Sequence, residues 1–91
     1  MNAARGEVAL EIEGKTHVLC LTLGALAELE AAFGCASLSE LQARLVRLSA
    51  QELSTVLEIL LRAAGSSADV MKVAPGAAAR AVAEAFNAAL G

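Results

Sequence analysis

The residues that could carry chemistry in this chain are few, and their spacing does not suit catalysis. His17 is the single histidine, and it lies in a stretch that alternates like a β-strand. Nucleophilic catalysis would need this imidazole beside a serine or cysteine, with an acid that orients it. Cys20 follows three residues later, so on a strand its side chain points to the opposite face. We therefore interpret His17 as an ordinary strand residue.

Acidic residues offer a second kind of chemistry. Glu7, Glu11 and Glu13 alternate along the same stretch and share one face of the expected strand. Two carboxylates held close together can act as general acid and base. On an exposed hairpin, such residues more commonly keep the protein soluble and protect a strand edge from further pairing. We favour this structural interpretation.

Metal and phosphate sites are not predicted either. Two cysteines and one histidine show no metal-binding spacing, and Asp69 is the only aspartate, which disfavours a carboxylate cage. The sequence contains neither a P-loop nor a GxGxxG motif. We predict that the protein is not an enzyme and that it uses no cofactor and no metal.

Composition and charge narrow the classes of partner. The chain has 91 residues, which suits one domain, and 57% of them are hydrophobic while 2% are aromatic. The core must therefore be aliphatic, with Phe33 and Phe86 as its only large rings. Because the net charge is −3 and the seven basic residues are scattered, nucleic acid is not an expected partner. So much apolar surface on a small chain favours burial of a face against another protein.

The chain also shows no signal for export or membrane insertion. Its first residues lack the apolar segment of a secretory signal, and no apolar run approaches the roughly 20 residues of a membrane span. We therefore expect a cytoplasmic protein. In that compartment Cys20 and Cys35 are expected as free, buried thiols, with a disulfide between them as the less favoured alternative.

The stretch 6–21 predicts a β-hairpin. Its first half alternates between apolar and polar residues, and Glu13-Gly14 supplies a turn. The apolar face of this first strand consists of Val8, Leu10 and Ile12. A two-stranded hairpin is not stable alone, so we expect it to dock on helices or on another chain.

Two registers of the hairpin are open. A two-residue loop turns Leu19 and Leu21 inward but requires a positive φ at Glu13, which is costly for a residue other than glycine. A three-residue loop avoids this cost and places an acidic residue opposite a basic one, but it turns Val18 and Cys20 inward instead. We favour Leu19 and Leu21 inward because they are the more hydrophobic pair.

A junction follows the second strand directly. Thr22 is a candidate N-cap for a helix over 23–33, in which Leu26, Leu29 and Phe33 form one apolar stripe. Gly24 allows close packing in the first turn, and Gly34 suits the position that ends a helix. We predict that this junction specifies the fold through six residues: Thr22, Gly24, Leu26, Leu29, Phe33 and Gly34.

Three more helices are predicted, over 38–48, 50–64 and 76–90, and a short helical turn capped by Ser67 is predicted over 68–73. The helices at 38–48 and 50–64 begin with capping-box patterns, Ser37 to Glu40 and Ser49 to Glu52. Two further pairs have the spacing of ion pairs on one helix, Glu40–Arg44 and Glu58–Arg62. The last helix has an expected buried stripe of Ala78, Val82, Ala85, Phe86 and Ala89.

These elements predict a single α+β domain over 1–91 that is mostly helical, with the N-terminal hairpin packed on about four helices. The helix over 50–64 has the strongest apolar period, and Ile59 widens its stripe. This width indicates either a helix buried on two sides within the monomer or a surface that binds a partner helix. The candidate interaction residues are Val56, Ile59 and Leu60, and the outer hairpin strand is a second candidate through strand addition.

The segment Arg5–Gly34 resembles a known family. The matching features are Gly6-Glu7-Val8, the Glu13-Gly14 turn and the string LTLGALAELE over 21–30. They are similar to the opening of the small tail proteins that gene transfer agents and related siphophages of alphaproteobacteria encode. Specific likeness covers the first third of the chain, and the overall length agrees.

The resemblance implies a non-enzymatic role in building a phage-like tail, in a gene transfer agent or a prophage. Members of the family are described either as tail tube proteins or as tail assembly chaperones. A chaperone of this kind binds the tape-measure protein, helps to recruit tail-tube subunits and is absent from the finished particle. A tube subunit would instead self-assemble as a homo-oligomer and stay in the particle. A small regulatory protein-binding domain is a third hypothesis.

Overall fold

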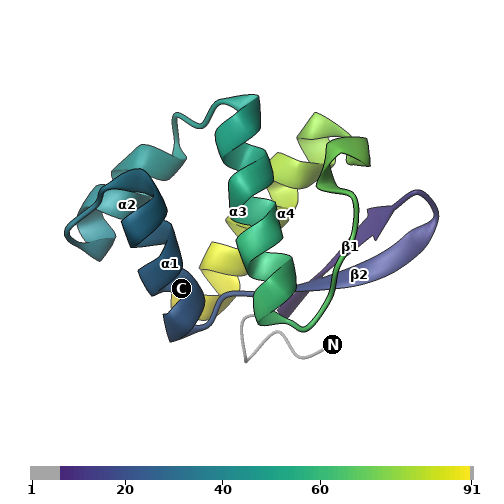
Figure 1. The fold of residues 1–91 in the computed structure, drawn as a ribbon, viewed down its shortest axis with the longest axis horizontal. Coiled ribbons are helices and arrows are strands. Elements are labelled where there is room, and N and C mark those ends of the chain that lie inside the picture. Colours follow the sequence, from purple (N-terminus) through teal and green to yellow (C-terminus); the bar gives the residue numbers. More distant parts are fainter. Residues whose placement is uncertain (1–6, 91) are drawn as a thin grey trace.

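The chain begins with a two-stranded antiparallel hairpin, made of β1 (Glu7–Ile12) and β2 (Lys15–Cys20) (Figure 1). The computed structural model describes residues 7–90. The predicted polar start at 1–5, the strand start at Gly6 and the final glycine therefore lie outside the described residues. The second strand ends one residue before the predicted end, and Leu21 continues inward as a buried residue.

The register of the hairpin is the one favoured from hydrophobicity. Val8 lies opposite Leu19, and Ile12 lies opposite Lys15, so the loop has two residues. Glu13 and Gly14 both take a positive φ, of 51° and 81°, as this kind of tight loop requires. The left-handed backbone of one non-glycine residue costs about 1–2 kcal/mol. Burial of each large aliphatic side chain contributes about as much or more, so the hydrophobic pattern decides the register.

Four α-helices and one short 3₁₀-helix follow the hairpin: α1 (Leu23–Phe33), α2 (Leu38–Leu45), α3 (Ala50–Ala63), η2 (Val70–Lys72) and α4 (Pro75–Leu90). Figure 1 shows α3 in the middle, with α1 and α2 on one side and the hairpin on the other. The strand β2 packs against α3, and β1 packs against α4. The architecture is therefore the expected mostly helical α+β fold, in which helices cover the hairpin.

The core is aliphatic and centres on α3. Its largest fully buried side chains come from β2, α1, α2 and α3: Leu19, Leu29, Leu41, Val56, Leu57, Leu60 and Leu61. The helix α3 packs against α1, β2 and α4, so it is covered on several sides. Neither phenylalanine is fully buried, since Phe33 and Phe86 both pack at the edge of the core.

The junction between strand and helix has the geometry of the prediction. The Ala25 backbone N–H donates to Thr22 Oγ1 at 3.0 Å, so Thr22 caps α1. Leu26 and Leu29 are buried, while Phe33 is half-buried. Gly34 ends the helix with φ at 65°, a value that favours glycine.

Several predicted helix ends shift in the structure. The helix predicted over 38–48 ends at Leu45, because Arg47 N–H bonds to the Arg44 carbonyl in a tighter turn. The helix predicted over 50–64 ends at Ala63, and the one predicted over 76–90 begins at Pro75. The turn predicted over 68–73 shortens to η2, and Asp69 replaces Ser67 as its cap, since its carboxylate accepts from Met71 N–H at 3.1 Å.

The capping boxes differ in detail. Ser49 and Glu52 form the complete reciprocal box at the start of α3. Ser37 Oγ accepts from Glu40 N–H as predicted, but the Glu40 carboxylate accepts from Ala36 N–H, one residue before the cap.

Both arginines of the predicted same-helix ion pairs bind elsewhere. Arg62 pairs with Glu28 of α1 at 2.6 Å, which ties α3 to α1. Arg44 pairs with Glu52 across the corner between α2 and α3, donates to the Arg47 carbonyl at 3.2 Å and lies over the Phe33 ring. We call this set, Arg44 with Glu52, Arg47 and Phe33, the Arg44 clasp.

The clasp changes the acidity of Glu52. The Ser49 backbone N–H donates to its carboxylate at 2.8 Å, and the Arg44 guanidinium adds a second, charged hydrogen bond. Together they hold the pKa of Glu52 below its ordinary value. The charged form of Glu52 is therefore favoured by folding.

The buried junction predicts the effect of a charge at Leu26. Leu26→Asp places a carboxylate at a site that is 7% exposed, so we expect a loss of about 4 kcal/mol or more in the free energy of unfolding. Leu23→Asp is the matched control on the same helix, because Leu23 is 82% exposed. Urea unfolding followed by circular dichroism measures both variants. Equal stability of the two would contradict the proposed core.

The lowered pKa of Glu52 predicts a pH dependence. Because the folded pKa is depressed, the contribution of this carboxylate is present above the ordinary value of about 4.3 and is lost as the pH falls through the lower folded value. Glu52→Gln should therefore lose less stability than the wild type between about pH 6 and pH 3. Urea titrations at the two pH values measure this difference, and Glu11→Gln, which leaves the clasp intact, should behave like the wild type.

Candidate functional site

The residues with catalytic potential lie along the hairpin, where Glu7 is the cross-strand partner of Cys20. His17 is half-buried opposite Leu10 on the hairpin, and Cys20 is buried three residues away on the same strand. Cys20 and Cys35 do not form the disulfide that was the less favoured alternative, and Cys35 is only partly buried. Within residues 7–90, no group of three or more histidine, cysteine or acidic side chains is placed to hold a metal ion.

The predicted interaction residues lie inside the protein. Val56 and Leu60 are fully buried, and Ile59 is 6% exposed. Their burial fits the alternative in which α3 is buried on two sides, since α3 packs against α1, β2 and α4. A partner could touch these three side chains only if the core opened, so an accessible surface must be sought elsewhere.

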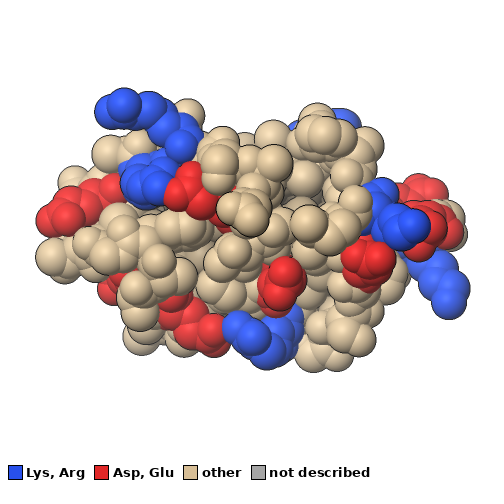
Figure 2. Space-filling model, turned by 45° about the horizontal axis from the view of Figure 1, so that its top comes forward, with Lys and Arg blue, Asp and Glu red and all other residues tan. Residues whose placement is uncertain are grey.

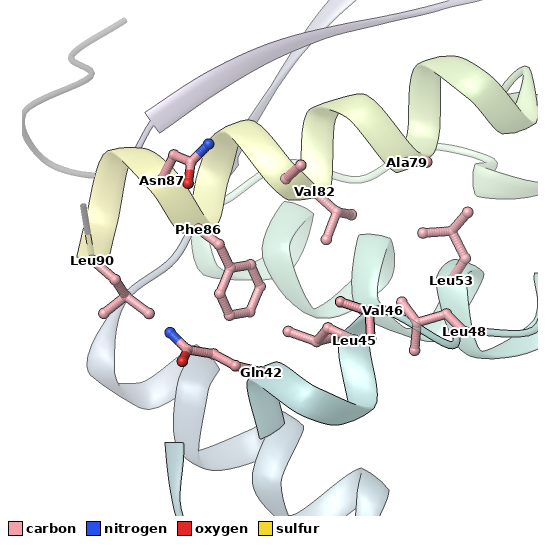
Figure 3. A pocket seen from close by; sticks show the side chains of 11 residues that line it. Gln42, Leu45, Val46, Leu48, Leu53, Ala79, Val82, Phe86, Asn87 and Leu90 are labelled. Carbon is pink, nitrogen blue, oxygen red and sulfur yellow. The ribbon is translucent and has the colours of Figure 1, made fainter. Parts of the chain in front are cut away.

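An apolar groove lies between α2 and α4. It has a volume of about 550 Å³. Its walls come from α2 and α4, and Leu48 and Leu53 close one end at the start of α3 (Figure 3). Its lining residues are Gln42, Leu45, Val46, Leu48, Leu53, Ala79, Val82, Ala83, Phe86, Asn87 and Leu90. We call this feature the α2–α4 groove.

Side chains from the two walls face each other across the groove. In Figure 3 the Phe86 ring projects from α4 toward Leu45 of α2. Val46 is 81% exposed and Leu90 is 41% exposed, although both are large apolar residues. These side chains therefore form exposed apolar surface along the groove.

Local sequence explains why the groove stays open. Along α4, Ala79 and Ala83 are too short to reach α2, so Phe86 and Leu90 are the large side chains on this face. The helix α2 has eight residues and buries only Leu41, and it packs mainly against α1. The two walls therefore share little direct contact.

The lining of the groove is uncharged. Among the residues that the structure describes, none of those lining the groove is charged, and the polar members are Gln42 and Asn87. Figure 2 shows the charged side chains of one face in small groups of mixed sign, with uncharged surface between them. This face gives no extended basic patch of the kind that binds a phosphate backbone.

Sequence reasoning missed the groove but named some of its members. Phe86 and Ala89 were predicted in the buried stripe of the last helix, whereas Phe86 is half-buried in the groove and Ala89 is exposed. Val46 was predicted inside a longer helix and stands instead at the corner where α2 ends. An exposed valine beside a half-buried phenylalanine is a signal that only the tertiary arrangement reveals.

None of the helices between residues 7 and 90 combines the length and hydrophobicity that a membrane crossing requires. Neither a curated protein nor a solved structure matches the chain. A family model described as "Phage tail tube protein, GTA-gp10" matches residues 5–91. This match extends the likeness of the N-terminal third over nearly the whole chain. The chain therefore belongs to the GTA-gp10 family of phage tail proteins, a family without enzymatic activity.

Proposed function

We propose that this tail protein is a tail assembly chaperone whose α2–α4 groove binds an amphipathic helix of the tape-measure protein. The observation that carries the proposal is the groove itself, which leaves Val46 and Leu90 exposed and Phe86 half-buried on a small tail-family chain. Uncovered apolar surface of this kind is typical of a protein-binding site. Family membership supplies the class of partner, because tail proteins act on other tail components.

The dimensions of the groove suit a helix. It follows α4 from Ala79 to Leu90, a length of about 16 Å at the rise of an α-helix. A bound helix that anchors side chains at i, i+3 or i+4, and i+7 spans about 10 Å. Two or three apolar anchors can therefore lie between α2 and α4. A neutral lining favours an apolar anchor face over a charged one.

The chemistry of the site supports a transient complex. The groove presents a few large apolar side chains and no charged pair that would lock one partner in place. In this role the protein acts in the cytoplasm during assembly, keeps the tape-measure helix soluble and helps to recruit tail-tube subunits. It then leaves before the particle is complete.

A structural tube subunit is the alternative, and the family's description as a tail tube protein favours it. A tube of closed sheet rings needs many strands, and the part of the chain described here has two. The two roles differ in the finished particle. A chaperone should be absent from purified particles, and a tube subunit should be present in stoichiometric copies along the tail.

Substitutions in the two walls of the groove test the chaperone proposal. Val46→Lys and Leu90→Lys each place a charge where an apolar anchor would lie, so each should weaken binding of the tape-measure protein roughly tenfold or more. Calorimetric titration with the tape-measure protein of the same gene cluster measures the Kd. Both variants should stay folded, because both positions are exposed.

Met71→Lys is the matched control, since Met71 is exposed on η2 and does not line the groove. It should bind like the wild type. Unchanged binding by both groove variants would exclude the groove as the site. If the wild type does not bind the tape-measure protein and purified tails contain stoichiometric copies of this protein, the tube-subunit hypothesis replaces the chaperone hypothesis.

A further inference from the structure

The wall of the groove formed by α2 is weakly attached to the rest of the protein. The helix α2 buries one side chain, Leu41, and packs mainly against α1. On its other side lies the groove, where Gln42 and Val46 are exposed and Leu45 packs at the edge of the core. A helix held along one side only can change its angle more easily than one packed on two sides.

One side chain spans the corner that sets this angle. The Arg44 guanidinium donates to Glu52 Oε1 at 3.3 Å and pairs with the second carboxylate oxygen. It also donates to the Arg47 carbonyl and lies 5.5 Å from the centroid of the Phe33 ring. Arg44 therefore connects α2 at once to α1, to the link after α2 and to the first turn of α3.

Glu52 is itself held in place by the first turn of α3. Its carboxylate accepts from the Ser49 N–H while Ser49 Oγ accepts from the Glu52 N–H, so it is part of the capping box that begins α3. The end of the groove that Leu48 and Leu53 close lies beside this same turn. A change in the angle between α2 and α3 at this corner must change the separation of α2 from α4.

We propose that α2 is a hinged wall and that the Arg44 clasp sets the width of the α2–α4 groove. Arg44 is thus a positioning residue, since it does not line the groove. The clasp holds α2 in the position seen here, and its release lets α2 swing about residues 46–49. The inference rests on the proposed function in one respect, which is that the groove is the binding site.

The test measures the width of the groove without any partner. Spin labels are attached at Ser39→Cys on α2 and Glu84→Cys on α4, which are exposed and lie outside the groove. Cys35→Ser removes the partly exposed native thiol, and the buried Cys20 stays in place. Pulsed electron resonance then gives the distribution of distances between the two labels.

Arg44→Met in this background should roughly double the width of the distance distribution, because α2 is released from α3. Arg44→Lys keeps the charge but loses the planar fork, so it should give an intermediate distribution. Arg62→Met is the matched control, since it removes the other ion pair between helices, which lies away from the groove. It should leave the distribution unchanged.

The wild type in about 1 M NaCl gives a second measurement that needs no substitution in the clasp, and screening of the ion pair should broaden its distribution. An unchanged distribution in Arg44→Met and in high salt would overturn the hinge, as would equal broadening in Arg62→Met. These results do not depend on the tape-measure protein. The distance distribution could broaden as expected while the protein fails to bind the tape-measure protein. That result would refute the proposed function and still support the hinge.

Discussion

Burial of the hairpin's apolar face is the constraint on which the rest of the structure depends. Two strands cannot form a stable sheet alone, so β1 and β2 must be covered. The helix α4 packs mainly on β1, and α3 packs on β2. This arrangement fixes α3 in the centre, where its side chains also meet α1. With few aromatic residues to fill space, aliphatic side chains from both strands and from every described helix supply the core. The hairpin and the central helix therefore specify each other.

Most of this arrangement could be predicted because it follows from local patterns. The strand alternation, the Thr22 cap and the Gly34 stop act within a few residues, and each has the predicted role. The register was decided correctly by hydrophobicity, because burial of Leu19 outweighs the backbone cost at Glu13. The period of α3 predicted a buried helix, but periodicity alone did not show which molecule would bury it.

What the sequence did not reveal depends on residues far apart in the chain. Arg44 and Arg62 have same-helix acidic neighbours at the right spacing, yet both bind carboxylates on other helices. A pair on one helix is worth a few tenths of a kcal/mol, so a modest gain elsewhere redirects the arginine. The α2–α4 groove is missed for a related reason. Its walls lie more than thirty residues apart, and a half-filled gap between helices leaves no periodic signal.

The residues that form the strand–helix junction and the residues that line the groove come from different parts of the chain. The N-terminal third, with its recognisable string around Leu26, makes the junction and contributes no lining residue to the groove. The groove comes from α2, the start of α3 and α4, whose sequences are ordinary leucine-rich and alanine-rich helix. Helix faces can exchange aliphatic residues with little effect on the core when those residues point into open space. Under the proposed function, a change of partner therefore needs substitutions only at positions such as Val46 and Leu90, while the hairpin and central helix keep the domain folded.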